Sequence, residues 1–136
     1  MQPQIALITI LTDDVPRLAA FYQHALGFAV KNDSGEYVEM ESAGVRFSVC
    51  TRAVMAQATG EETYNLAPQG HSFELAFPCA TAGDVDAAYT GLLAKGARGV
   101  QPPATMPWGQ RTAFFADPDG NIHEIFADAP EGTSNE

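Results

Sequence analysis

The hydrophobic pattern at the start of the chain predicts a strand followed by a helix. Residues 4–11 (QIALITIL) are apolar and rich in β-branched side chains, as in a buried strand. From Val15 to Leu26 the apolar residues instead recur at helical spacing. An aspartate directly before this stretch can cap the helix, and Gly27 can end it.

Three further strands and a linker are predicted after this helix. The strands, around residues 28–32, 36–41 and 45–51, are divided by the turn-forming sequences DSGE and SAG. Residues 53–70 (AVMAQATGEETYNLAPQG) show no clean period. We interpret them as a linker in which a short helical turn could form.

The same pattern returns in the second half of the chain. Residues 71–79 (HSFELAFPC) are strand-like, and residues 83–97 (GDVDAAYTGLLAKGA) place an apolar stripe on one side of a helix. The sequence ADPDGN suits a tight turn between two antiparallel strands. Strands are therefore predicted around residues 98–103, 110–118 and 121–127.

The two halves can be overlaid on equivalent residues. Asp14–Val15 matches Asp84–Val85, Gly27 matches Gly96, and Gly44 matches Gly120. A repeated order of strand, helix and three strands is a strong indicator of architecture. We therefore expect an α+β fold, one domain over residues 1–128, made of two tandem βαβββ modules. The modules are placed at about 4–52 and 71–128, with a flexible tail at 129–136.

Composition narrows the class of protein. The chain of 136 residues is 46% hydrophobic and 18% charged, which is enough to bury a core. Its net charge of −10 argues against a nucleic-acid partner. No apolar stretch is long enough for a membrane span, and the N-terminus lacks the pattern of a signal peptide. Cys50 and Cys79 fit two buried free thiols in a reducing compartment, so we expect a cytoplasmic protein.

A family resemblance follows from these features. The stretches DDVPRLAAFYQHALGF and PWGQRTAFFADPDGNIHEIF, with the repeat, resemble the vicinal oxygen chelate superfamily. Its members include glyoxalase I, extradiol dioxygenases, fosfomycin-resistance proteins and bleomycin-binding proteins. The resemblance covers about residues 4–128. It implies that the modules form a cup-shaped, partly open barrel and that the chain is a homodimer. Whether the modules pair within one chain or across two stays open.

The resemblance also implies four positions for a metal, one on the first and one on the last strand of each module. In this sequence they are Leu7, Ser48, Glu74 and Glu124. None is a histidine, whereas zinc or nickel needs imidazole or several anionic ligands, and an extradiol dioxygenase needs two histidines and a carboxylate. We expect no resident cofactor beyond a divalent metal held weakly by Glu74 and Glu124.

The two glutamates have other interpretations. In one cavity they would raise each other's pKa, so that one could act as a general base, or they could receive a cationic ligand. Alternatively they are solvated, or paired with arginines such as Arg111. His123 adjoins Glu124 on a strand and is expected to face the opposite way, as a surface or partly buried structural residue. His71 is expected to be structural as well.

Further pocket candidates lie near the end of the chain. Trp108 could cover a pocket, Arg111 could hold a carboxylate or phosphate, and Phe115 could add an aromatic wall. Leu7 and Ser48 would line the same substrate site. The alternatives are interface packing for Trp108 and an ion pair for Arg111.

Three functions compete at this point. One is a glyoxalase-type lyase or isomerase, in which Glu124 abstracts a proton and a metal or Arg111 stabilises the enolate. The second is a non-catalytic protein that sequesters a cationic or aromatic small molecule. The third is a dimeric domain that binds a metabolite in the cup.

Overall fold

The computed structural model describes residues 1–130 and divides the chain into two compact units, Met1–Gln69 and a second that begins at Gly70. The predicted flexible tail lies mostly outside the described residues. Each unit contains one four-stranded sheet, and neither sheet closes into a barrel. No helix in the described part of the chain combines the length and the apolar character needed to cross a membrane.

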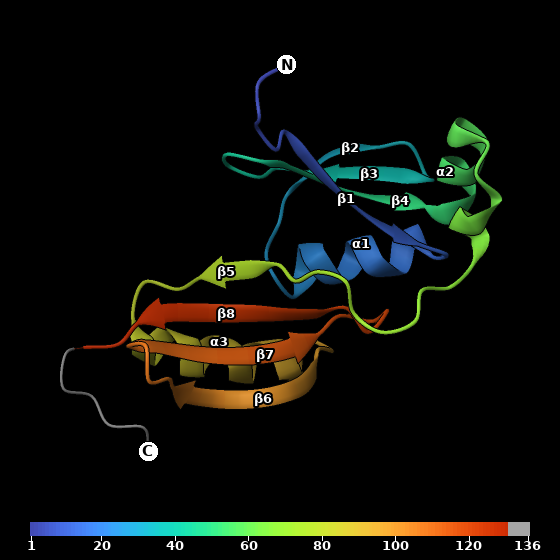
Figure 1. Ribbon diagram of the computed structural model, residues 1–136. Coiled ribbons are helices and arrows are strands. Elements are labelled where there is room, and N and C mark those ends of the chain that lie inside the picture. The colour runs from blue at the N-terminus through green and yellow to red at the C-terminus, as the bar shows by residue number, and fades with distance from the viewer. Residues whose placement is uncertain (131–136) are drawn as a thin grey trace. The chain divides into compact units, whose positions relative to one another are not determined.

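The first unit has the predicted order of strand, helix and three strands. Its elements are β1 (Leu7–Thr12), α1 (Val15–His24), β2 (Val30–Asp33), β3 (Tyr37–Met40) and β4 (Arg46–Thr51). The strands lie in the order β1-β4-β3-β2, with β1 and β4 parallel and the other pairs antiparallel. Figure 1 shows α1 lying along one face of this sheet.

The local sequence accounts for α1 and for the face that it covers. The Asp14 carboxylate accepts a hydrogen bond from the Arg17 backbone N–H, and Pro16 occupies the first turn. The apolar side of the helix packs on the sheet, where the rings of Tyr22 and Phe47 lie 5.1 Å apart. Since alternate residues of a strand face opposite ways, the β4 residues beside Phe47 face away from α1. We call the face opposite the helix the far face of each sheet.

The linker contains more helix than expected. Residues 52–59 form α2 (Arg52–Thr59), and a 3-10 turn, η1 (Glu62–Asn65), follows. Thr51 caps α2 by accepting a hydrogen bond from the Val54 N–H, and Gly60 ends it at φ 75°. No residue of α2 is fully buried, so the helix lies at the surface of the first unit.

The second unit repeats this topology. Its elements are β5 (Ala76–Pro78), α3 (Ala82–Ala94), β6 (Arg98–Thr105), β7 (Gln110–Ala116) and β8 (Ile122–Asp128). The strand order is β5-β8-β7-β6, with β5 and β8 parallel. The prediction of an α+β fold with two tandem βαβββ modules is therefore confirmed. The first strand is shorter than predicted, because residues 71–75 lie in the loop before it.

An ion pair identifies the face of the second sheet that α3 covers. The Arg111 guanidinium on β7 donates two hydrogen bonds to Asp86 on α3, of 2.6 and 3.1 Å. Ala113 and Phe115, the alternate β7 residues that share a face with Arg111, are fully buried. Their neighbours across the strand pair are Ile125 and His123, which are buried as well. The intervening residues of β7 and β8, such as Phe114 and Glu124, therefore lie on the far face.

Candidate functional site

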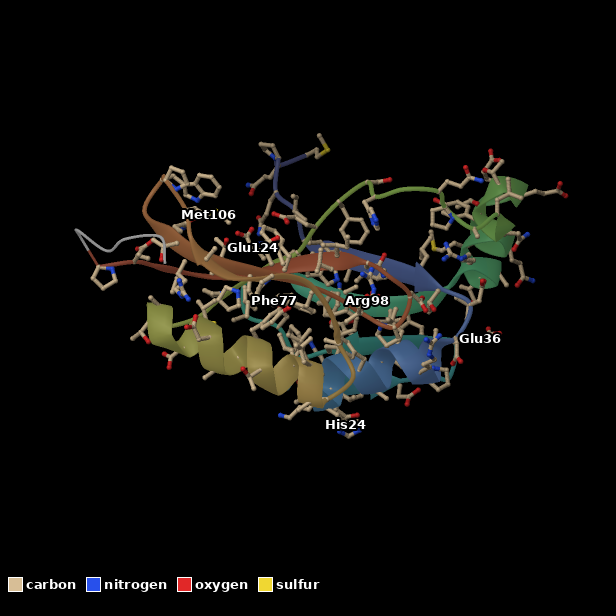
Figure 2. The ribbon with its side chains drawn as sticks, turned by 90° about the horizontal axis from the view of Figure 1, so that it is seen from below. His24, Glu36, Phe77, Arg98, Met106 and Glu124 are labelled. Atoms are coloured by element: carbon tan, nitrogen blue, oxygen red, sulfur yellow. The ribbon has the colours of Figure 1, made fainter. Side chains whose placement is uncertain are left out.

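Glu124 lies on the far face of the second sheet, opposite the helix. Its pairing partners are Phe114 on β7 and Ala76 on β5. Figure 2 shows Glu124 on the side of the strands away from α3 and Phe77 on the side toward it. Ile122 and Phe126 share the far face on β8, so the carboxylate has apolar neighbours along the strand and across it.

Glu74 is the residue whose carboxyl group interacts with that of Glu124. It lies in the loop just before β5, at an exposed position. Burial raises the pKa of Glu124, and hydrogen bonding to Glu74 and repulsion between the two carboxylates raise it further. The Leu75 carbonyl accepts a hydrogen bond from the Glu124 N–H at 2.9 Å, which ties the Glu74 loop to β8. The structure thus brings these two predicted residues together.

No cation neutralises this pair among the residues that the structure describes. Within residues 1–130, arginine or lysine side chains instead pair with Glu39, Asp13 and Asp86. A half-buried carboxylate on an apolar face without a counter-ion is costly in its charged form. The physical responses available to it are to hold a proton or to bind a cation from solution.

Arg111 and Phe115 lie on the opposite face of the sheet from Glu124. Arg111 forms an ion pair with Asp86, the alternative role considered for it in the sequence. It also donates to the Thr105 hydroxyl at 3.1 Å. Phe115 is fully buried, with its ring 5.9 Å from that of His123. Phe115 was expected to form an aromatic wall of the pocket. Its neighbour Phe114, which pairs with Glu124, lies on the far face instead.

The remaining predicted residues are more scattered. Trp108 is 66% exposed in the β6–β7 turn, where its indole N–H donates to the Gln110 side chain at 3.1 Å. Leu7 and Ser48 belong to the far face of the first sheet. Leu7 is 39% exposed, whereas Ser48 is fully buried and shares a 2.8 Å hydrogen bond with the Thr9 hydroxyl.

His123 and His71 occupy different environments. His123 faces away from Glu124 as predicted, but it is fully buried rather than partly exposed. Its Nδ1 accepts a hydrogen bond from the Leu75 N–H at 3.1 Å, and its Nε2 lies 3.7 Å from the Asp117 carboxylate. The ring therefore fastens the loop before β5 to β8 and to the turn. His71 is exposed in that loop.

A charged cluster on the far face of the first sheet was missed by the sequence analysis. Glu39 on β3 is only 6% exposed. It accepts two hydrogen bonds from Arg46, of 2.7 and 3.0 Å, and one from the Tyr37 hydroxyl at 3.2 Å. The Lys31 ammonium is 3.8 Å away. Hydrogen bonds from Arg46, its charge and the contribution of Tyr37 outweigh the effect of burial and lower the pKa of Glu39 to about 2.

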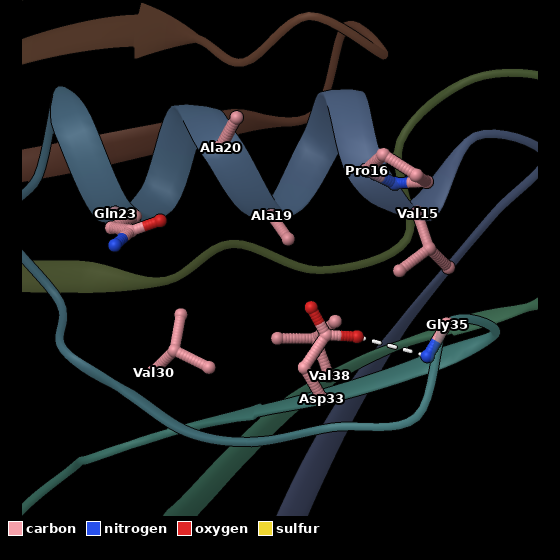
Figure 3. A pocket seen from close by; sticks show the side chains of 9 residues that line it. All are labelled: Val15, Pro16, Ala19, Ala20, Gln23, Val30, Asp33, Gly35 and Val38. Atoms are coloured by element: carbon pink, nitrogen blue, oxygen red, sulfur yellow. Dashed lines mark hydrogen bonds between the residues drawn. The ribbon is translucent and has the colours of Figure 1, made fainter.

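A cavity of about 260 Å³ lies in the first unit between α1 and the β2–β3 hairpin (Figure 3). Its walls run from Val15 to Gln23 on the helix and from Val30 to Val38 on the hairpin, and most of them are apolar. The Asp33 carboxylate at its edge accepts a hydrogen bond from the Gly35 N–H at 2.9 Å. None of the residues predicted for the site lines this cavity.

The residues at the implied metal positions do not fit a tightly held metal. Leu7 has no donor atom, and the Ser48 hydroxyl is engaged by Thr9. Glu74 and Glu124 supply two carboxylates, fewer than a stable site for zinc, nickel or iron requires. Within residues 1–130, no group of three or more histidine, cysteine, aspartate or glutamate side chains is arranged to hold a metal ion.

The repeated topology defines a protein of the doubled βαβββ class. A family profile described as the Glyoxalase/Bleomycin resistance protein/Dioxygenase superfamily matches residues 4–125. The chain belongs to that superfamily, which confirms the resemblance noted in the sequence.

Individual proteins agree with this assignment. The chain is 31% identical over 123 residues to the protein YraH of Bacillus subtilis (strain 168), covering 88% of this chain and 94% of YraH. A glyoxalase/bleomycin resistance protein/dioxygenase from Nocardioides is 26% identical with a TM-score of 0.84, covering 100% of this chain and 90% of its own. Lactoylglutathione lyase from Agrobacterium tumefaciens, at 18% identity and a TM-score of 0.71 over 93% of this chain and 94% of its own, shares the fold.

Proposed function

We propose that the protein binds a small organic cation on the far face of the second sheet, against Glu124 and Glu74. The observation that supports this function is the half-buried Glu124 carboxylate, coupled to the exposed Glu74, with no cation paired to either in the described part of the chain. Phe114 is the cross-strand neighbour of Glu124, and Phe126 lies two residues along the same strand. Carboxylates beside aromatic rings are the chemistry that recognises organic ammonium groups.

Proton release should accompany binding of the cation. Because the pKa of Glu124 is raised by burial and by Glu74, its carboxyl keeps its proton to higher pH than an ordinary glutamate, and a bound cation favours the ionised form. Affinity should therefore increase with pH until Glu124 is ionised in the free protein. A ligand that is held only by apolar contact would lack this dependence.

Calorimetric titration with benzyltrimethylammonium tests this function, with benzyl alcohol as the uncharged comparison. We expect binding that is tighter at about pH 8 than at about pH 5. Glu124→Gln and Glu74→Gln should each weaken it about tenfold, as expected for loss of a charge partner. Glu36→Gln is the matched control, because Glu36 is an exposed glutamate of the first unit (Figure 2). Equal affinity for the cation and the alcohol, or equal effects of all three variants, would contradict the proposal.

Proton transfer is a second candidate function, and the raised pKa of Glu124 favours it. In this reaction a Glu124 oxygen takes the proton from a hydroxyl-bearing carbon next to a carbonyl. The C–H electron pair forms a carbon–carbon double bond, and the carbonyl π pair moves to the carbonyl oxygen. Return of the proton to the former carbonyl carbon, with transfer of the hydroxyl proton from the first carbon's oxygen to the second oxygen, would complete an isomerisation. Arg111 cannot stabilise this enolate, because it binds Asp86 on the other face of the sheet.

The two functions separate in one assay. Lactoylglutathione lyase shares this fold, so the hemithioacetal of methylglyoxal and a thiol is a suitable test substrate. If Glu124 transfers a proton, the protein in D₂O should exchange or isomerise this compound, and Glu124→Gln should remove the activity while Glu36→Gln retains it. Absence of turnover and of deuterium exchange would exclude this chemistry for the compound and leave the binding function.

A further inference from the structure

The cavity of about 260 Å³ in the first unit lies on the helix side of its sheet, between α1 and the β2–β3 hairpin (Figure 3). Its inner wall is apolar and is made by Val15, Ala19 and Val38, which are all buried. Two polar side chains also line it, Gln23 from the helix and Asp33 from β2. The cavity is therefore separate from the far face of the sheet.

The second unit fills the corresponding space with a tyrosine. In the overlay of the two helices, Tyr89 of α3 occupies the position of Ala19. The strand registers likewise place Gly99 at the position of Val30. The Tyr89 hydroxyl lies directly over Gly99, so close that a Cβ at this glycine would collide with it. Because protein interiors are close-packed, the space that Ala19 leaves open in the first unit calls for an explanation.

Gln23 presents a polar group where the second unit has an apolar one. It lies in the last turn of α1, at the position of Leu93 in α3. The Leu93 side chain packs over Gly99 beside Tyr89, with its Cδ2 atom 3.3 Å from the place of a Cβ. In the first unit an amide faces this space instead, and its carbonyl oxygen can accept a hydrogen bond from a ligand.

Asp33 gives the cavity a negative charge that no side chain within residues 1–130 neutralises. One of its carboxylate oxygens accepts a hydrogen bond from the Gly35 N–H at 2.9 Å, and Figure 3 shows the other oxygen directed toward α1. The arginine and lysine side chains of this part of the chain pair with other carboxylates. Lys31, two residues before Asp33, lies 3.8 Å from Glu39 on the far face. A fixed carboxylate beside an apolar wall suits a ligand with a positive charge and a hydrocarbon part.

We propose that this cavity binds a small primary amine in its ammonium form. The ammonium group has three N–H donors, which reach Asp33 and the Gln23 carbonyl while the hydrocarbon part lies against Ala19 and its apolar neighbours. The volume is below the roughly 300–1,000 Å³ of sites for drug-sized ligands, so the ligand is small. This site belongs to the first unit and does not depend on the function proposed for Glu124.

Titration of the ¹⁵N-labelled full chain with benzylamine tests the site, at about pH 7, where an alkyl ammonium group is charged. We expect saturable shifts at the amides of Ala19, Gly35 and Val38. Benzyl alcohol lacks the charge and benzyltrimethylammonium lacks N–H donors, so each should bind here about tenfold more weakly. Binding of benzylamine at Glu124 would shift amides of β8 instead, and the two sites are therefore read separately.

Three variants sharpen this test. Asp33→Asn keeps an acceptor for the Gly35 N–H but loses the charge, so benzylamine should bind about tenfold more weakly. Glu36→Gln removes an equal charge from the same hairpin at an exposed position that does not line the cavity, and should leave the affinity unchanged. Ala19→Leu places a larger side chain in the cavity (Figure 3), so it should abolish the saturable shifts without lowering the urea midpoint.

Four results would overturn the proposal. They are shifts that do not saturate or that map outside the cavity, benzyl alcohol binding as tightly as benzylamine, equal effects of Asp33→Asn and Glu36→Gln, and wild-type affinity in folded Ala19→Leu. Far-UV circular dichroism checks the fold of each variant. If Ala19→Leu does not fold, the comparison of Asp33→Asn with Glu36→Gln decides.

Discussion

His123 holds the loop that carries Glu74, and His123→Phe tests this role. Its Nδ1 accepts a hydrogen bond from the Leu75 N–H at 3.1 Å, while its ring lies 6.0 Å from Phe77 and 5.9 Å from Phe115. A phenylalanine keeps an aromatic ring at this place and removes the acceptor. A partly buried backbone donor left without a partner costs about 1–3 kcal/mol. With a urea dependence of about 2 kcal/mol/M, the midpoint should fall by about 0.5–1.5 M.

The assay combines urea unfolding, followed by far-UV circular dichroism, with hydrogen exchange at the Leu75 amide. His24→Phe is the matched control, since His24 is exposed at the end of α1, and its effect should stay within about 0.5 kcal/mol. The Leu75 amide should exchange faster in His123→Phe alone. If the two variants have the same midpoint and Leu75 keeps its protection, the hydrogen bond does not hold the loop, and this reasoning is wrong.

Three further predictions concern stability. Gly99→Ala should cost about 1–3 kcal/mol in thermal unfolding, because its new Cβ would collide with the Tyr89 hydroxyl, and adding Tyr89→Phe should recover part of the loss. Leu18→Ala removes a fully buried side chain and should cost about 3 kcal/mol in urea unfolding, whereas Leu93→Ala at a 40% exposed position should cost less than about 1 kcal/mol. The pKa of Glu39 is lowered from 4.5 to about 2, so its ionised form stabilises the fold above about pH 4.5 and this contribution is lost as pH falls through about 2. The stability difference between wild type and Glu39→Gln should therefore shrink over that range in acid titrations, and a difference that grows would contradict it.

The fold was predictable because its information is repeated in the chain. Each module has a helical pattern followed by a glycine, so two weak patterns support one another. The element α2 could not be predicted in the same way. It is short, it buries no residue completely, and the other module has no counterpart to support it. Hydrogen bonds at its ends define it instead: the Thr51 hydroxyl accepts one from the Val54 N–H, and the Gly60 N–H donates one to the Ala56 carbonyl.

The site was predictable where a single strand decides the geometry, and not where two strands must be aligned. His123 and Glu124 are neighbours on one strand, so their opposite directions follow from alternation alone. Phe114 and Phe115 lie on a different strand, and choosing between them requires the length of the intervening turn. Glu39 was missed for a related reason. One glutamate in a short alternating strand looks solvated until Arg46, two residues from its partner Ser48 on the next strand, is known to reach it.

The two units share one topology but differ in the polar side chains on their far faces. Phe47 and His123 occupy equivalent positions, and both are buried rings that face the helix of their own unit. The next residue of each strand faces the other way, and there the units differ, with Ser48 in one and Glu124 in the other. Buried helix-facing rings and the polar far-face side chains therefore occupy alternate residues of the same strand. It follows that exchanging far-face residues should alter binding while the helix-facing core keeps the fold.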